Sequence, residues 1–291
     1  MKFGLRLLPV FGLSLVLQAC GDRETSSFGG LSGILPAQEA PVEDLTAEQI
    51  FARGEALLNE GEAEDAAQAF SEVERLFPYS DWSRRAALRQ TFAYNRAKDY
   101  EQSRGAAQRF LDFYPADPEA ARAHYMIALS YYDQIDTVSR DQGIAFQALQ
   151  GFRTVIENYP DSEFVNPSLL KFDLALDHLA GKEMEIVRFY LKRKHPGAAI
   201  NRFRAVVEDF QTTSHTAEAL HRLVESYLIL GLRDEAQTAG AILGHNYRST
   251  DWYEDSYTLL TEAGIDPEKA ARRGDGWLTK VYRQVLSGKW I

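Results

Sequence analysis

A boundary that recurs five times along the chain most constrains its fold. An aromatic residue, usually followed by proline, precedes polar residues and then a helical pattern, and it begins the segments 77–86, 114–123, 159–168, 210–219 and 247–256. Proline ends the helix before it, and serine, threonine or aspartate caps the helix after it. Because this boundary recurs at spacings of 37, 45, 51 and 37 residues, it predicts a row of stacked helix pairs.

The interior of each repeat shows the same pattern when it is counted back from the boundary aromatic. Positions 11, 7 and 4 residues before that aromatic lie on one face of a helix. The first of them is always small, which lets two helices approach closely, and the others mostly fill the space between repeats. The three positions hold Ala66, Phe70 and Val73 in the first repeat, then Ser103, Ala107 and Phe110, then Ala148, Phe152 and Val155, then Ala199, Phe203 and Val206, and finally Ala236, Gly240 and Leu243.

These repeats predict an all-α fold, a right-handed solenoid of five tetratricopeptide-like helix pairs with a C-terminal helical extension. The pairs are expected at 46–78, 79–115, 116–160, 161–211 and 212–247. The two longest hold insertions, which we place at 135–141 and in a first helix of the fourth pair that runs to about Lys194. Residues 46–160 therefore form an N-terminal group of three repeats, and residues 161–247 form a C-terminal group of two.

The extension at 248–291 contains an amphipathic pattern. Trp277, Val281 and Val285 recur at four-residue spacing inside a segment, 266–291, whose net charge is +3. A helix with one apolar face either caps the open end of the solenoid, which we prefer, or docks on a partner or on anionic headgroups.

The N-terminus has the organisation of a secretory signal. Lys2 and Arg6 precede an apolar run at 7–17 that is shorter than a bilayer-spanning helix, so residues 1–19 are predicted to be a signal peptide rather than a buried helix. The stretch 17–20, Leu-Gln-Ala-Cys, looks like a bacterial lipobox, which predicts lipidation of Cys20, palmitate included. Residues 20–45 are then a lipidated cysteine and a flexible tether, and Gly21 favours the outer membrane.

Composition excludes several classes of function. The chain has 32 Lys plus Arg against 42 Asp plus Glu, a formal net charge of -10, which disfavours nucleic acid as a partner. Its single cysteine allows neither an intrachain disulfide nor a cysteine-based zinc site. His215 and His221 are six residues apart and face opposite sides of a helix. Without a catalytic motif or a metal-ligand cluster, we expect no enzyme, no metal and no cofactor beyond the lipid on Cys20.

The lipobox, the five repeats and the segment 179–203 together resemble the BamD family, the outer-membrane lipoprotein subunit of the β-barrel assembly machinery. The resemblance covers about residues 45–250 and is most specific at 183–185 (Glu-Met-Glu), 189–190 (Phe-Tyr) and 197–202 (Gly-Ala-Ala-Ile-Asn-Arg). It implies a non-catalytic scaffold on the periplasmic face of the outer membrane. Its expected partners are a BamA-type barrel protein bound through a POTRA domain, other Bam lipoproteins, unfolded outer-membrane proteins and, through the lipid anchor, the membrane.

The resemblance also assigns roles to parts of the chain. The C-terminal repeats are expected to contact BamA, and the matching positions are Asn201 and Arg202. Arginine suits such a contact because its planar fork can hold a carboxylate by two hydrogen bonds. The alternative for Arg202 is a solvated arginine on a helix surface.

The N-terminal repeats are expected to receive clients, whose targeting signal ends in an aromatic residue and a free carboxylate. First helices line the concave side of a solenoid, and equivalent positions on them carry cations, aromatic rings and an amide. We therefore predict a client-peptide groove that binds by stacking and by a charge-assisted hydrogen bond; for each aromatic, the alternative is ordinary packing between repeats. The groove residues are Arg85, Phe92, Asn95, Arg122, Tyr125 and Tyr132.

Two other functions compete with this one. A periplasmic tetratricopeptide adaptor in cell division or cell-wall synthesis would share the repeats, although residues 21–45 lack the heptads of a coiled coil. An enzyme such as a cell-wall hydrolase would need a catalytic domain, and no stretch outside the repeats is long enough for one.

Overall fold

The computed structural model describes residues 41–135, 142–267 and 276–286, with the side chains of the last helix described through Gln284. These ranges hold twelve α-helices, one short 3-10 helix and no strand. None of these helices is both long enough and apolar enough to cross a bilayer. The predicted signal peptide, Cys20 and the tether up to residue 40 lie outside the described residues.

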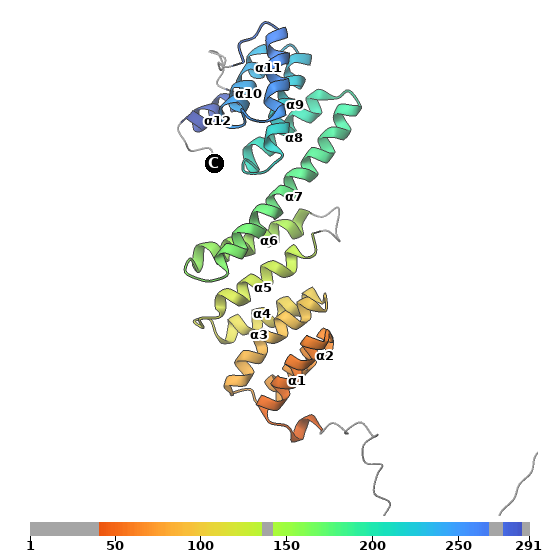
Figure 1. Ribbon diagram of the computed structural model, residues 1–291, viewed down its shortest axis with the longest axis vertical. Coiled ribbons are helices and arrows are strands. Elements are labelled where there is room, and N and C mark those ends of the chain that lie inside the picture. The colour runs from red at the N-terminus through yellow and green to blue at the C-terminus, as the bar shows by residue number, and fades with distance from the viewer. Residues whose placement is uncertain (1–40, 136–141, 268–275, 287–291) are drawn as a thin grey trace, which may run out of the picture. The chain divides into compact units, whose positions relative to one another are not determined.

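The helices pair as the boundaries predict. Consecutive helices pack against each other in chain order from α1 to α11, and α12 packs on α10 (Figure 1). The elements are η1 (Val42–Asp44), α1 (Ala47–Glu60), α2 (Ala63–Leu76), α3 (Asp81–Arg96), α4 (Tyr100–Phe113), α5 (Ala120–Tyr132), α6 (Gln142–Asn158), α7 (Val165–Lys192), α8 (Pro196–Asp209), α9 (Thr216–Ile229), α10 (Arg233–Asn246), α11 (Asp251–Glu262) and α12 (Trp277–Leu286). The expected all-helical architecture of five tetratricopeptide-like pairs is therefore confirmed.

Local sequence explains where the helices begin and end. Thr46 and Gln49 form a reciprocal capping box at the start of α1, and Gly61 ends that helix in the left-handed region at φ 92°. The boundary aromatics act at the other end of each pair. Tyr114, for example, follows α4 and donates its backbone N–H to the carbonyl of Phe110, four residues earlier, and Pro115 then prevents continuation of the helix.

The predicted interior positions form the core. Every residue found 11, 7 or 4 positions before a boundary aromatic is buried. Close helix contact requires a small residue at some of these crossings. At Gly151 of α6, an added Cβ would lie 2.7 Å from the Cβ of Ala128 on α5, so the two backbones meet where no larger residue fits.

The structure also differs from the prediction at the N-terminal end. Residues 42–44, placed by the sequence in a flexible tether that ends at 45, form the 3-10 helix η1. Val42 and Leu45 pack against the core of α1, α2 and α3. The compact unit that holds the repeats thus begins at Val42. Two apolar side chains cover its first repeat, a feature too short to show a period.

The two predicted insertions lie where the longer spacings required them. Helix α7 has 28 residues and ends at Lys192, two residues before the expected Lys194. The third repeat interrupts its pair between α5 and α6, and residues 136–141 of that interruption lie outside the described residues.

The C-terminal extension packs on the last repeat. Helix α11 contacts α9 and α10, and Leu278 and Val281 of α12 are buried in the same core cluster. Because Leu278 and Val281 are covered by the chain itself, α12 fits the capping interpretation. The side chain of Val285 and residues 268–275 lie outside the described part of the chain.

Candidate functional site

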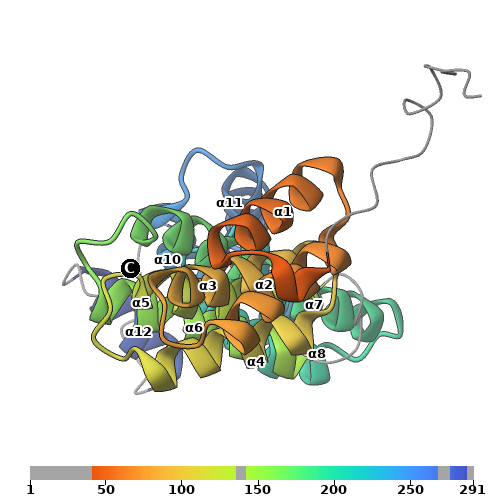
Figure 2. The ribbon, with the colours of Figure 1, turned by 90° about the horizontal axis from the view of Figure 1, so that it is seen from below.

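Four arginines surround a cavity of about 590 Å³ on the N-terminal repeats. It opens where the first helices α1, α3 and α5 follow one another, an order that Figures 1 and 2 both show. We call it the arginine cavity. Its lining residues are Phe51, Glu55, Arg84, Arg85, Leu88, Arg89, Glu119 and Arg122.

Three of these arginines are held by carboxylates of the same chain. The pairs bridge different helices or a helix and the turn beside it, and they fix the walls of the cavity rather than leaving four cations for a ligand. The pairs are Arg84 with Asp117 (2.9 Å), Arg89 with Glu55, and Arg122 with Glu119 (2.9 Å).

Arg85 differs from the other three. Among the residues that the structure describes, it forms no ion pair; its guanidinium carbon instead lies 4.4 Å from the ring centroid of Trp82 and 5.0 Å from that of Phe51. Stacking uses the face of the guanidinium, whereas its N–H donors lie in the plane. Arg85 is therefore an oriented and exposed cation beside the apolar Phe51 and Leu88, an arrangement that suits a carboxylate attached to an aromatic group.

The six residues predicted for one groove do not share one cavity. Only Arg85 and Arg122 line the arginine cavity. Tyr125 is half-buried between the rings of Phe152 (6.0 Å) and Phe164 (5.2 Å). Its burial raises the pKa of its phenol. Tyr125 thus takes part in packing between repeats, the alternative stated for the aromatics.

Two further predicted residues, Asn95 and Tyr132, lie near the carboxyl group of Asp133. Tyr132 packs edge-on against Phe152 and carries the ammonium of Lys171 4.3 Å from its ring centroid. Next to it, burial raises the pKa of Asp133, while the charge of Lys171 and the nearby amide of Asn95 act in the opposite direction. When Asp133 is ionised, this region disfavours a client carboxylate. Sequence reasoning did not predict this acidic region, because it compared only positions that are equivalent between repeats.

Phe92 lies between these two regions. Its ring is half-buried and has the guanidinium groups of Arg89 (5.3 Å) and Arg96 (5.8 Å) over it. Sequence reasoning also missed Phe51 and Glu55, which form one wall of the arginine cavity. It missed Trp82 as well, on whose ring Arg85 stacks. The i,i+4 spacing of Phe51 and Glu55 on α1 was the signal that could have indicated a shared face.

The predicted contact on α8 has a partner inside the chain. Asn201 and Arg202 are exposed, as a contact surface requires. Nη1 of Arg202 donates to both carboxylate oxygens of Glu183 on α7, at 2.9 and 3.2 Å. Glu183 is buried and also accepts from Gln142 Nε2 at 3.1 Å. Arg202 is thus neither fully solvated nor unpaired; it presents a half-exposed guanidinium anchored from behind.

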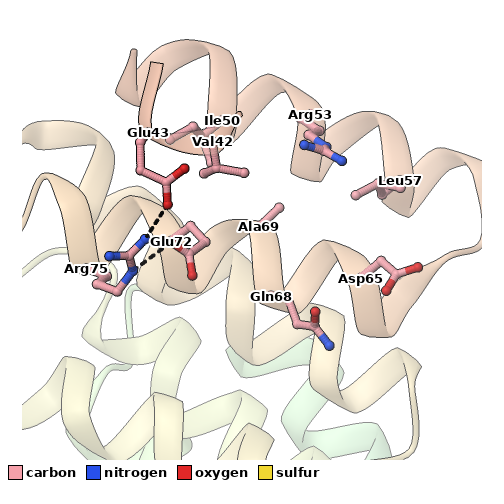
Figure 3. A pocket seen from close by; sticks show the side chains of 10 residues that line it. All are labelled: Val42, Glu43, Ile50, Arg53, Leu57, Asp65, Gln68, Ala69, Glu72 and Arg75. Atoms are coloured by element: carbon pink, nitrogen blue, oxygen red, sulfur yellow. Dashed lines mark hydrogen bonds and ion pairs between the residues drawn. The ribbon is translucent and has the colours of Figure 1, made fainter. Parts of the chain in front are cut away.

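A second cavity, of about 540 Å³, lies at the N-terminal end between η1, α1 and α2 (Figure 3). Val42, Ile50, Leu57 and Ala69 give it an apolar surface. Arg75 spans its edge and pairs with both Glu72 and Glu43, the latter at 3.6 Å. The pair of Arg75 with Glu43 links η1 to α2, so Arg75, Glu43 and Glu72 at this edge of the cavity are all paired.

His215 and His221 contact different groups. His215 approaches Asp177 of α7 at 3.7 Å. His221 is buried, with Nδ1 2.8 Å from Ser256 Oγ and Nε2 3.7 Å from Glu225. Although this order of groups resembles a hydrolytic triad, Ser256 is only 1% exposed and substrate has no access to its hydroxyl. Within the described residues, no group of three or more His, Cys, Asp or Glu is placed to hold a metal ion.

Comparison with known proteins gives consistent results. Residues 43–242 match the family model YfiO, described as an outer membrane lipoprotein. The outer membrane protein assembly factor BamD of Caulobacter vibrioides is 43% identical over 242 residues, which cover 83% of this chain and 79% of that protein. The protein of the same name from Rickettsia prowazekii is 39% identical over 260 residues, covering 89% and 98%. Among solved structures, a thermophilic TPR protein of Thermus thermophilus aligns with a TM-score of 0.36 at 16% identity, covering 74% of this chain and 100% of that one.

Proposed function

The chain belongs to the YfiO family of outer membrane lipoproteins, and from this premise we propose that it is a non-catalytic scaffold in outer-membrane protein assembly. The observation that carries the proposal is the assembly-factor name of two relatives that are 43% and 39% identical over most of the chain. A row of packed helix pairs supports the scaffold role, because each pair presents side chains on a continuous surface. No observation favours a cell-division or cell-wall adaptor over this role.

In this proposal the N-terminal repeats bind unfolded outer-membrane proteins at the arginine cavity. Arg85 would receive the terminal carboxylate of the client, and Phe51 and Leu88 would contact its last aromatic side chain. Support comes from the stacked, exposed guanidinium of Arg85. The other three arginines already form ion pairs with carboxylates of the same chain. Because Asp133 repels negative charge, earlier residues of the client would lie toward Tyr132 and its carboxylate toward α1.

The C-terminal repeats would bind the POTRA domain of a BamA-type barrel protein through Asn201 and Arg202. Support comes from the exposure of both side chains and from the anchoring of Arg202 by Glu183, which limits the conformations of a long side chain before it binds. A lipid on Cys20 would hold the scaffold at the periplasmic face of the outer membrane, where other Bam lipoproteins would join it.

A peptide-binding experiment tests the client site. A fluorescent peptide that ends in phenylalanine with a free carboxylate should bind the mature chain about 10-fold more tightly than its amidated form, since a charge-assisted hydrogen bond is lost on amidation. Arg85→Met should remove that difference. Arg96→Met is the matched control, because Arg96 also stacks on an aromatic ring of α3 but lies outside the cavity. Equal binding of the two peptides by the parent chain would contradict carboxylate capture.

Cross-linking tests the proposed orientation. A photoreactive group on the last client residue should label α3 near Arg85, and one placed about five residues earlier should label α5 near Tyr132. The reverse pattern would show that the client lies in the opposite direction.

A further inference from the structure

A run of basic residues lies in the turn between α7 and α8. Lys192, Arg193, Lys194 and His195 are all exposed. In the described part of the chain, Lys192, Arg193 and Lys194 form no ion pair, and Arg193 lies 4.2 Å over the exposed ring of Phe189. Lys194 has a φ of 60°, so the turn is tight. These three adjacent cations give the turn a local positive charge in a chain whose formal net charge is -10.

The turn between α9 and α10 is apolar instead. Ile229 is 71% exposed, Leu230 46% and Leu232 40%. Gly231 takes a φ of 75° and makes this turn tight as well. Large apolar side chains gathered on a protruding turn, rather than scattered singly, mark a surface that another phase or molecule covers.

The two turns lie at the same end of the C-terminal repeats. Helix α8 packs between α7 and α9, and the short connection at 210–215 makes α8 and α9 antiparallel. The start of α8 therefore lies beside the end of α9. Side chains next to both turns, including Leu191, Ile200 and Leu228, also pack against one core cluster. We call this surface the cationic–apolar edge; it consists of Phe189, Lys192, Arg193, Lys194, Ile229, Leu230 and Leu232.

We propose that the cationic–apolar edge binds an anionic phospholipid surface. Cations attract such a surface over a Debye length, and apolar side chains on convex turns insert among the headgroups. The edge protrudes on two turns and does not line either cavity described above, which favours a fluid lipid layer over a shaped polypeptide partner. Asp234 and Glu235 follow Leu232 but occupy the first turn of α10, where acidic residues stabilise the helix N-terminus.

Membership of an outer membrane lipoprotein family strengthens the inference. A chain held near a bilayer by an anchor meets the lipid surface at high effective concentration, so a weak second contact is enough to orient it. In sequence, the edge is more than 140 residues from Val42, where η1 begins. Contact at both places would fix the orientation of the repeats, whereas an anchor on a tether alone would not.

Vesicle flotation tests the charge contribution. The mature chain carrying Cys20→Ser, which removes the acylation site, is mixed with vesicles of phosphatidylethanolamine and phosphatidylglycerol (about 3:1) or of phosphatidylcholine alone. We expect partitioning onto the anionic vesicles that falls at least ~10-fold in K192E/K194E. The matched control is R96E/K98E, which makes the same charge change in the α3–α4 turn and also alters a lysine at positive φ; it should remain within about twofold of the parent.

A second pair of variants tests the apolar contribution. I229S/L230S should reduce partitioning about 10-fold, whereas L170S/L174S, which removes two exposed leucines of α7, should not. Unfolding midpoints verify that all four variants fold. The proposal is overturned if the parent binds phosphatidylcholine equally well, if each control falls as far as its test variant, or if the edge captures an acidic protein domain while the chain ignores anionic vesicles.

Discussion

The ion pair between Glu183 and Arg202 permits a quantitative test of the α7–α8 contact. Its two side chains differ in environment: Glu183 is 9% exposed and Arg202 48%. Arg202→Met removes the charge and keeps the apolar stem, and Glu183→Gln removes the charge and keeps the shape. These single variants and their combination make a double-mutant cycle.

The expected magnitudes follow from burial. Removing one partner of a fully buried pair costs about 3–5 kcal/mol, and exposed pairs contribute about 0–1 kcal/mol. Arg202→Met strands a buried carboxylate that keeps only Gln142 at 3.1 Å, but water reaches the half-exposed site, so we expect a loss of about 2 kcal/mol. Glu183→Gln leaves a guanidinium that water can solvate and should cost about 1 kcal/mol. The double variant should also lose only about 1 kcal/mol, which gives a coupling near 2 kcal/mol.

Native-state amide hydrogen exchange in α7 and α8 is the suitable measurement. Repeat proteins need not unfold in one step, and exchange reports the free energy of local opening at the helices concerned. Additive losses, with a coupling below about 0.5 kcal/mol, would refute the reasoning. The same variants separate stability from recognition: if Arg202 contacts a POTRA domain, the double variant regains α7–α8 protection relative to Arg202→Met without regaining POTRA binding.

Three further outcomes are expected. Gly151→Ala should destabilise the chain by about 1–3 kcal/mol, because its Cβ would overlap Ala128. Gly105→Ala should instead gain up to ~1 kcal/mol, because its Cβ would lie in ordinary contact, 3.7 Å from Arg109 Nη1. Urea unfolding compares the two variants. Burial lowers the pKa of His221. The unfolded chain therefore binds more protons than the folded chain as pH falls below about 6.5, and stability decreases there. His221→Gln should flatten this pH dependence of stability, and an unchanged profile of unfolding midpoints would exclude the histidine as its source. Burial raises the pKa of Asp133, so its ionised form destabilises the folded state at neutral pH. Asp133→Asn should therefore increase the free energy of unfolding by up to about 0.5 kcal/mol at pH 7.5 and leave it unchanged below about pH 4. Thermal unfolding at both pH values measures this difference.

The repeat architecture could be predicted because its information is local. A helix pair needs a breaker, a cap and a face of core residues, and all three lie within one repeat. The boundary aromatics and the positions 11, 7 and 4 before them therefore located every pair, including the long α7. The 3-10 helix at 42–44 could not be predicted in this way, since two apolar residues show no period.

The long-range pairings at the candidate sites could not be predicted, because they join residues far apart in the sequence, whereas the pair of Arg122 with Glu119 is local. Arg89 reaches Glu55, 34 positions earlier, and Arg84 reaches Asp117, 33 positions later. One repeat separates the members of each pair, so their contact depends on the rotation between stacked repeats. Sequence spacing placed Arg85 and Arg122 at equivalent positions but could not show that Arg122 is paired and Arg85 is not. This distinction determines which of them can bind a ligand.

The positions that fix the solenoid are also not those that give it a function. Counted from the boundary aromatic, the residue 19 positions later is Arg96 in the second repeat and Asp133 in the third. Both lie at the ends of first helices, yet their charges are opposite, while the core positions of the same two repeats stay small or apolar. Core packing tolerates no such exchange, because an unpaired buried charge is costly. Half-exposed positions do tolerate it, and each repeat can therefore present different chemistry on an unchanged scaffold. Equivalent positions in successive repeats therefore predict the core reliably but do not predict the binding surface. On that surface, the positions that differ from repeat to repeat indicate the residues that discriminate between ligands.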